Sequence, residues 1–110
     1  MITLPLPPLS TNHGYHVAGG RFYKDKRLKD WEEECLGILK PFVKKVQVNY
    51  AVSIVFYFGN KRKNDIDGKI KPILDLLQKA GFYPDDSLVT ELHVVKEYDT
   101  VNPCVKVSCL

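Results

Sequence analysis

Two pairs of aspartates are the residues of this chain whose type and spacing could do chemistry. Asp65 and Asp67 stand two residues apart, and the adjacent pair Asp85 and Asp86 begins eighteen residues after Asp67. Two carboxylates held about 4 Å apart repel by roughly 4 kcal/mol at an effective dielectric of 20, so a cluster of them needs a counter-charge. Mg²⁺ and Mn²⁺ prefer such hard oxygen ligands, usually together with water and a substrate phosphate. The aspartates therefore predict a divalent cation site.

Basic residues surround the first acidic pair, at positions Lys61, Arg62, Lys63, Lys69 and Lys71. The formal net charge is only +3. The lysines and arginines nevertheless occur in runs, and clustered positive charge attracts phosphate backbones. A solvated surface is the more common explanation of any single run of charges. A cation bound here would polarise a phosphoryl oxygen and lower the pKa of its water. The combination indicates metal-dependent cleavage of a phosphodiester.

Two roles are open for Lys71. It lies four residues after Asp67 and four before Asp75. On a helix this spacing forms a ladder of charge pairs that contributes about 0.2–0.5 kcal/mol per pair. Alternatively, the Lys71 ammonium lies beside the cation and neutralises charge that develops in the transition state. Spacing alone favours neither role.

Each acidic pair also has a purely structural explanation. Asn64, Asp65 or Asp67 could be the N-cap of a following helix, since such side chains accept hydrogen bonds from its free N–H groups. The second pair, in the run FYPDDS, could form a turn, because Asp after Pro favours one. These explanations become strained when both pairs and the basic surroundings are taken together. An amphipathic helix between the pairs would let them fold back toward one another.

Composition bounds the class of protein. A chain of 110 residues with 45% hydrophobic and 26% charged residues suits one globular domain, residues 1–110. No apolar run is long enough to span a membrane and the N-terminus does not resemble a signal peptide. The cysteines, Cys35, Cys104 and Cys109, lack C-x-x-C spacing and predict reduced thiols in a cytoplasmic protein. The common nucleotide-binding and serine-hydrolase motifs do not occur, so no small-molecule cofactor is expected.

Hydrophobic periodicity predicts the elements that must position these residues. The expected elements are strands over residues 2–6, 46–58, 88–98 and 104–110, helices over residues 24–40 and 67–80, and a long loop over residues 9–22. This order predicts an α+β fold, a single small domain with a mixed β-sheet packed against two helices. The turn at residues 100–103 suggests that the last two strands form a hairpin. Glu32, Glu33 and Glu34 are expected to be exposed to solvent.

The chain resembles the RusA family of crossover junction endodeoxyribonucleases, found in bacteria, phages and prophages, in the segment NDIDGKIKPILDLLQKAGFYPDDSLV. The family pattern has D-x-D-N, a lysine four residues after the second aspartate, and then L-x-x-A-G-x-x-x-D-D. The chain also opens like the family, with a short strand, Pro7, Pro8 and a loop rich in Ser and Asn that ends near Tyr15. The resemblance implies a RusA-like, homodimeric fold.

The resemblance further implies Mg²⁺-dependent resolution of Holliday junctions, with Mn²⁺ as a second candidate ion. Such an enzyme cuts two opposed strands of branched DNA symmetrically, in DNA recombination and repair. By motif position, Asp65, Asp67 and Asp86 are the metal-binding catalytic carboxylates, Asp85 is a supporting ligand and Lys71 is the catalytic lysine. The segments that match DNA-contacting parts of the family contain Lys61, Arg62, Lys63, Asn64, Lys69, Ser10, Thr11, Asn12 and His13.

Gly68 departs from the family pattern, because the family commonly has Asn at this position. The departure keeps a second hypothesis open, a non-catalytic junction-binding or DNA-binding protein of prophage origin. A third hypothesis is a scaffold or protein-interaction domain, which would have no affinity for nucleic acid. A four-way junction has approximate two-fold symmetry, so a paired cut requires two active centres, as a two-fold dimer supplies. The apolar strand at residues 88–95 is a candidate surface for that dimer.

Overall fold

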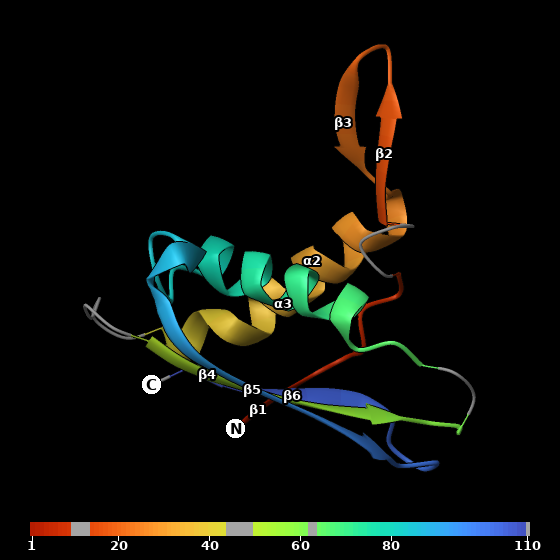
Figure 1. The fold of residues 1–110 in the computed structure, drawn as a ribbon, viewed down its shortest axis with the longest axis vertical. Helices are drawn as coiled ribbons and strands as arrows, with labels where there is room; N and C mark the ends of the chain where they lie inside the picture. Colours follow the sequence, from red (N-terminus) through yellow and green to blue (C-terminus); the bar gives the residue numbers. More distant parts are fainter. Residues whose placement is uncertain (10–13, 44–49, 62–63, 110) are drawn as a thin grey trace.

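The fold is a four-stranded sheet with helices on one face (Figure 1). This computed structural model describes residues 1–9, 14–43, 50–61 and 64–109. The elements in chain order are β1 (Ile2–Leu4), β2 (Tyr15–Ala18), β3 (Arg21–Lys24), α2 (Lys26–Leu39), η1 (Lys40–Phe42), β4 (Tyr50–Phe58), α3 (Asp67–Ala80), η2 (Asp86–Leu88), β5 (Val89–Tyr98) and β6 (Cys104–Cys109). The predicted α+β class, with a mixed sheet against two helices, is confirmed. No described helix is long and apolar enough to cross a membrane.

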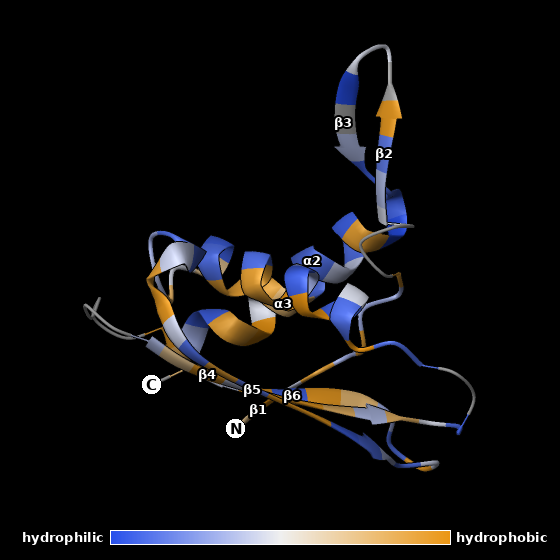
Figure 2. Cartoon of the chain, in the orientation of Figure 1, coloured by the Kyte–Doolittle hydropathy of each residue, from blue (hydrophilic) through white to orange (hydrophobic). Residues whose placement is uncertain are grey.

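The central strand β4 carries the clearest alternation in the chain. Tyr50, Val52, Ile54, Phe56 and Phe58 are buried, while the residues between them are only half-buried. A strand presents successive side chains to opposite faces, so this period of two buries one face under the helices. The predicted alternation is confirmed over residues 50–58, and residues 46–49 lie outside the described part of the chain. Figure 2 shows the matching apolar stretches on both helices and along the sheet.

Helix α3 has the bounds that the sequence predicts. Its buried side includes Ile73, Leu76 and Leu77, which join the core against β4. It ends at Gly81, whose φ of 98° is left-handed and whose N–H bonds the last carbonyls of the helix. Its N-cap residue is Ile66, with no capping side-chain hydrogen bond. The N-cap explanation of the first acidic pair is therefore wrong.

The last two strands do not form the expected hairpin. The sheet order is β1-β6-β4-β5, so β4 lies between β5 and β6. β5 runs parallel to β4 and β6 runs antiparallel to it. A parallel pair needs a crossover connection, which α3 supplies between β4 and β5. Once α3 fixes β5 on one edge of β4, the other edge of this buried strand remains for β6. In this order both edges of β4 form hydrogen bonds, one with β5 and the other with β6. If β5 and β6 formed a hairpin, only one of them could pair with β4.

The long loop expected over residues 9–22 is wrong for residues 15–22, which contain strand β2 and the start of strand β3. β2 and β3 form an antiparallel hairpin that projects from the helices (Figure 1). Gly19 and Gly20 form its turn, with φ values of 58° and 75°. Consecutive left-handed residues suit a two-residue hairpin turn, because its twist matches that of the strands. The Gly-Gly pair, read from the sequence as a loop signal, is in fact a hairpin signal.

Glu32 is buried rather than exposed, with 3% of its surface accessible, whereas Glu33 and Glu34 are exposed as expected. Its carboxylate accepts hydrogen bonds from Lys24 of β3 and, at 3.0 Å, from Lys79 of α3. The hydrogen bond from Lys79 to this carboxylate raises the pKa of the lysine. A buried carboxylate needs such partners because desolvation penalises its charge. Glu32 therefore ties α2 to α3 and to the base of the β2–β3 hairpin.

Glu32→Gln should destabilise the fold by about 2 kcal/mol, because the amide carries no negative charge for the two lysines and its NH2 group cannot accept the second of their hydrogen bonds. The midpoint of urea unfolding measures this change. Glu33→Gln is the matched control, because Glu33 is the exposed neighbour on the same helix and should change stability by less than about 0.5 kcal/mol. Equal midpoints for the two variants would show that the buried contact contributes nothing.

Candidate active site

The first acidic pair lies at the N-terminal end of α3. Asp67 is the first residue of the helix, Asp65 precedes its N-cap, and both are exposed. Negative charge is favourable at a helix N-terminus, because the N–H groups there carry partial positive charge. Exposure leaves both carboxylates accessible from solvent. Two hard oxygen ligands are thus available at one place on the surface.

The second acidic pair lies beyond the other end of α3. Asp85 is the N-cap of η2, and its carboxylate accepts the Ser87 N–H at 2.9 Å. This backbone hydrogen bond lowers the pKa of Asp85. The turn explanation is thus confirmed for Asp85. The Asp86 N–H donates to Gln78 Oε1 at 3.0 Å, which holds Asp86 close to the last turn of α3.

The two acidic pairs do not meet within one chain. Gln78, the contact of Asp86, is eleven residues after Asp67 in the sequence. A helix rises 1.5 Å per residue, so this separation is roughly 16 Å along the α3 axis. Figure 1 shows the same arrangement, with the start of α3 and the turn before β5 at opposite ends of the helix layer. Accordingly, no group of three or more His, Cys, Asp or Glu among the described residues could hold a metal ion.

Lys71 forms the charge pair that its spacing predicts. Its Nζ lies 3.4 Å from Asp75 Oδ1, and 57% of the lysine side chain is exposed. Tyr15 Oη donates to the other carboxylate oxygen of Asp75 at 2.9 Å. Burial raises the pKa of Tyr15, so the phenol stays protonated and remains a donor. Sequence reasoning missed this bond between the hairpin and α3, because nothing local links residues sixty positions apart.

The predicted DNA-contacting residues are only partly described. Ser10, Thr11, Asn12, His13, Arg62 and Lys63 lie outside the described residues. Lys61 is exposed, with its Nζ 5.9 Å from the centre of the Tyr98 ring. Asn64 Nδ2 donates to the Asn60 carbonyl at 3.2 Å. The Lys69 ammonium donates to the Pro7 carbonyl at 3.0 Å, and its burial lowers the pKa of the lysine. Lys69 thus holds the N-terminal segment against α3.

The residue before the first acidic pair contacts strand β5, and the sequence does not predict this contact. Lys96, near the end of β5, donates from its Nζ to the Asn64 carbonyl at 3.2 Å. Asn64 directly precedes Asp65, so the contact places the first acidic pair near the C-terminal end of β5. The alternation of apolar and polar residues predicts only that Lys96 lies in a strand. It does not predict that its side chain contacts Asn64.

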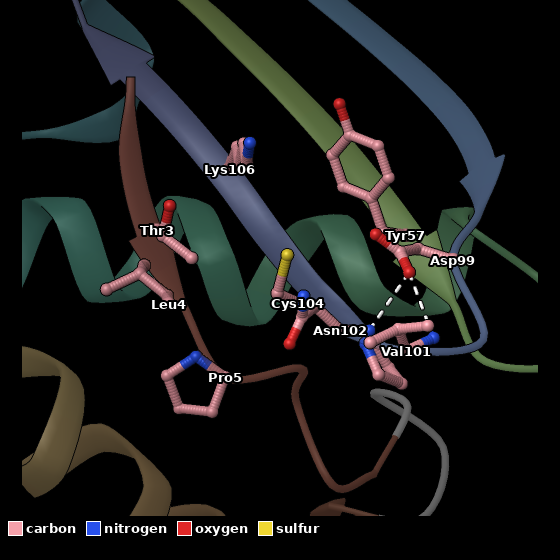
Figure 3. Close-up of a pocket in the computed structure, with 10 residues that line it drawn as sticks. Thr3, Leu4, Pro5, Tyr57, Asp99, Val101, Asn102, Cys104 and Lys106 are labelled. Atoms are coloured by element: carbon pink, nitrogen blue, oxygen red, sulfur yellow. Dashed lines mark hydrogen bonds between the residues drawn. The ribbon is translucent and has the colours of Figure 1, made fainter.

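The structure also contains a pocket of about 710 Å³. Its walls come from the ends of β1, β4 and β6 and from the β5–β6 connection (Figure 3). Lys106 Nζ lies 5.3 Å from the centre of the Tyr57 ring, and Asp99 Oδ1 accepts the N–H groups of Val101 and Asn102. None of the predicted site residues lines it. Asp65, Asp67 and Asp85 are instead exposed at the protein surface, and Asp86 is half-buried.

Comparison with known proteins agrees with the motif. A sequence model described as Endodeoxyribonuclease RusA matches residues 5–109. A protein of Aquifex aeolicus named crossover junction endodeoxyribonuclease RusA is 33% identical over 98 residues, which cover 87% of this chain and 76% of the relative. Proteins of that name from Escherichia coli K12 and Enterobacteria phage 82 are each 32% identical over 97 residues, which cover 86% of this chain and 80% of each relative. The match spans nearly the whole chain and includes both acidic pairs, so this chain belongs to the RusA family of endodeoxyribonucleases.

Proposed function

We propose that this protein resolves Holliday junctions by symmetrical, metal-dependent cleavage of two opposed DNA strands, in recombination and repair. The observation that carries the proposal is the exposed aspartate pair at the start of α3, in a chain whose relatives are named crossover junction endodeoxyribonucleases. The chain acts as one domain, residues 1–110, in the cytoplasm. Three free cysteines fit a reducing compartment.

Mg²⁺, or Mn²⁺ in its place, is the proposed metal. Its ligands are Asp65 and Asp67 from one end of α3 and Asp86 from the other, with Asp85 in support. Mg²⁺ is commonly held by one or two carboxylates, with water and substrate phosphate completing the shell. The exposed oxygens of Asp65 and Asp67 fit this chemistry. The ion would supply Lewis acidity at the phosphoryl group and an activated water.

A single chain cannot bring these ligands together, because Asp67 and Asp86 lie at opposite ends of α3. A two-fold dimer solves the geometry when it places the Asp86 end of one copy beside the Asp67 end of the other. It then contains two equivalent centres, each with carboxylates from both copies. Two centres also match the two-fold symmetry of a four-way junction. We therefore propose that the active form is a homodimer.

The proposed DNA track runs beside the first acidic pair. The described residues proposed for it are Lys61 and Asn64; Arg62, Lys63, Ser10, Thr11, Asn12 and His13 are also proposed to contact DNA and lie outside the described residues. Positive side chains at this place would contact phosphates and release counterions, so binding should weaken as salt rises. Lys69 is proposed to help indirectly, by holding the segment that precedes residues 10–13.

The decisive experiment compares wild-type protein with Asp67→Asn on labelled synthetic four-way junctions in Mg²⁺. Wild type should give paired, symmetrical nicks. Asp67→Asn should cut roughly a hundredfold to a thousandfold more slowly, because one metal ligand contributes several kcal/mol to transition-state stabilisation. Junction binding, measured by fluorescence anisotropy, should be kept.

Asp30→Asn is the matched control, because Asp30 is an exposed helical aspartate far from α3 in sequence. It should cut at the wild-type rate. Full-rate cutting by Asp67→Asn would remove the proposed mechanism. If the wild-type protein binds junctions tightly but never cuts them, the non-catalytic hypothesis is favoured. That hypothesis comes from Gly68, which stands where the family commonly has Asn. A protein without any affinity for DNA would support the scaffold hypothesis.

A further inference from the structure

The β2–β3 hairpin has one face that contacts the helices and one that does not share these contacts. Tyr15 and Lys24 are directly opposite in its register, so they lie on the same face, and both donate hydrogen bonds to the helices. His16 and Tyr23 are the next opposed pair and lie on the other face. Arg21 is two residues before Tyr23 and shares its face. His16, Arg21 and Tyr23 form the outer face of the hairpin.

The outer face presents an aromatic ring to solvent. Tyr23 is 48% exposed, and the centre of its ring lies 5.2 Å from that of His16, with the two planes 33° apart. The imidazole thus covers part of the phenol ring, and a large part of the ring surface stays open. Flat partners stack on such a surface at the same ring spacing.

The imidazole behind this ring is held in place. His16 Nε2 donates to Asp25 Oδ2 at 3.0 Å, and the Arg27 backbone N–H donates to the other oxygen at 2.9 Å. Hydrogen bonds from Arg27, and then from His16, lower the pKa of Asp25, so its carboxylate stays ionised and keeps both partners. His16 therefore supports Tyr23 before any partner arrives. A preorganised ring loses less conformational entropy on binding than a mobile one.

Arg21 adds a positive charge to the outer face. It is exposed, and it forms no ion pair within the part of the chain that the structure describes. Lys24 and Arg27, by contrast, are paired with carboxylates. A guanidinium binds phosphate oxygens, and an aromatic ring stacks on a nucleobase. An exposed cation beside an exposed ring therefore fits a nucleotide better than a purely apolar partner.

The contact between the hairpin and α3 places the outer face near the first acidic pair. Tyr15 Oη donates to Asp75, which is eight residues after Asp67 and thus roughly 12 Å along the helix axis. From this contact the hairpin projects beyond the helices (Figure 1). Successive nucleotides of one strand are about 3.4 Å apart, so 12 Å corresponds to roughly three or four nucleotides. DNA with a phosphate at Asp67 therefore passes the hairpin within a few nucleotides.

We propose that Tyr23 stacks on a nucleobase at the branch point of the junction, while Arg21 contacts a neighbouring phosphate. The inference rests on the proposed function, which makes branched DNA the partner. In a continuous duplex each base is stacked between its neighbours and exposes only its edges in the grooves. Withdrawing a base from that stack costs free energy, and the cost is least where pairing is already interrupted. The outer face thus distinguishes branched from linear DNA.

Fluorescence anisotropy in EDTA tests the contact without cleavage, using a labelled four-way junction and a linear duplex made from the same sequences. Tyr23→Ala should weaken junction binding roughly fivefold to a hundredfold, as loss of one base–aromatic stack does, and leave duplex binding unchanged. Tyr23→Phe keeps the ring and should bind like wild type. Val17→Ala is the matched control, because Val17 is 64% exposed on the opposite face of the hairpin. It should bind both DNAs like wild type.

Tyr23→Leu keeps apolar bulk against His16 and gives the same test if Tyr23→Ala does not fold, as circular dichroism would show. It should lose junction affinity selectively as well. Arg21→Ala should reduce the slope of log affinity against log salt by about one phosphate contact. Wild-type junction affinity in a folded Tyr23→Leu variant, or an equal loss on junction and duplex, overturns the proposal.

Photocrosslinking gives a direct measurement of the contact. A 5-iodouracil at the branch point should crosslink to the peptide that contains Tyr23, whereas the same base in the middle of an arm should not. Absence of this crosslink in wild type overturns the proposal. A protein that forms the crosslink but never cuts junctions in Mg²⁺ keeps the inference and rejects the proposed function. Cutting by wild type, together with unchanged binding by the Tyr23 variants, does the reverse.

Discussion

Mixing Asp67→Asn protein with Asp86→Asn protein should restore junction cleavage to a rate well above the slow residual cutting of either variant alone. In a mixed dimer with shared centres, one centre receives both substitutions and the other receives none. The intact centre contains Asp67 from one copy and Asp86 from the other. Random assortment of subunits by co-refolding produces such dimers, and gel analysis of labelled junctions detects their activity. The product should be a single nick rather than a paired cut, because only one centre of each mixed dimer works.

The matched control is a mixture of Asp65→Asn with Asp67→Asn. These residues lie at the same end of α3, so every centre of the mixed dimer carries one substitution and cleavage should stay at background. If each centre were built within one chain, neither mixture would recover activity. Recovery in the control as strong as in the test mixture would also contradict shared centres. The pair of mixtures therefore measures how the carboxylates are divided between the copies.

Lys71→Ala should slow the cleavage step by roughly a hundredfold to a thousandfold, as removal of one preorganised charge at a transition state commonly does. Lys71 lies one helical turn after Asp67, and more than half of its side chain is exposed. Its pairing with Asp75 is a weak surface contact that a substrate phosphate can replace. Single-turnover rates at saturating protein measure the effect on the chemical step.

Lys29→Ala is the control, because Lys29 is an exposed lysine on α2 and should leave the rate unchanged. Junction affinity for Lys71→Ala should fall little, and the salt dependence of binding should change by about one phosphate contact at most. An equal loss of affinity and rate would make Lys71 a binding residue only. An unchanged rate would show that Lys71 has no part in the cleavage step and that its role is limited to the ion pair with Asp75.

Local signals predicted the helices well. The apolar stripe and Gly81 predict α3 over Asp67–Ala80, and the structure has the same bounds. A helix start and stop depend on a few neighbouring residues, so a sequence window contains the necessary information. The alternation of β4 is equally local. These are the elements that present the first acidic pair.

Partners distant in sequence were predicted poorly. The hairpin expected from the turn at residues 100–103 is replaced by two strands on either side of β4. Glu32 was expected in solvent, because no local pattern shows that Lys24 and Lys79 converge on it. Strand order and buried charge pairs depend on how the whole chain buries apolar surface. Periodicity reports only which face of an element is apolar.

Residue type and spacing are sufficient to identify the family, the α+β class and the candidate ligands Asp65, Asp67, Asp85 and Asp86, because they are the same in any conformation. The positions of these ligands relative to one another depend on how the chain folds. The parallel placement of β5 beside β4 requires α3 to run the full length of the crossover, which holds Asp67 and Asp86 at opposite ends of the helix. A rigid helix cannot shorten that separation, so proximity of the two acidic pairs became a question of assembly rather than of sequence.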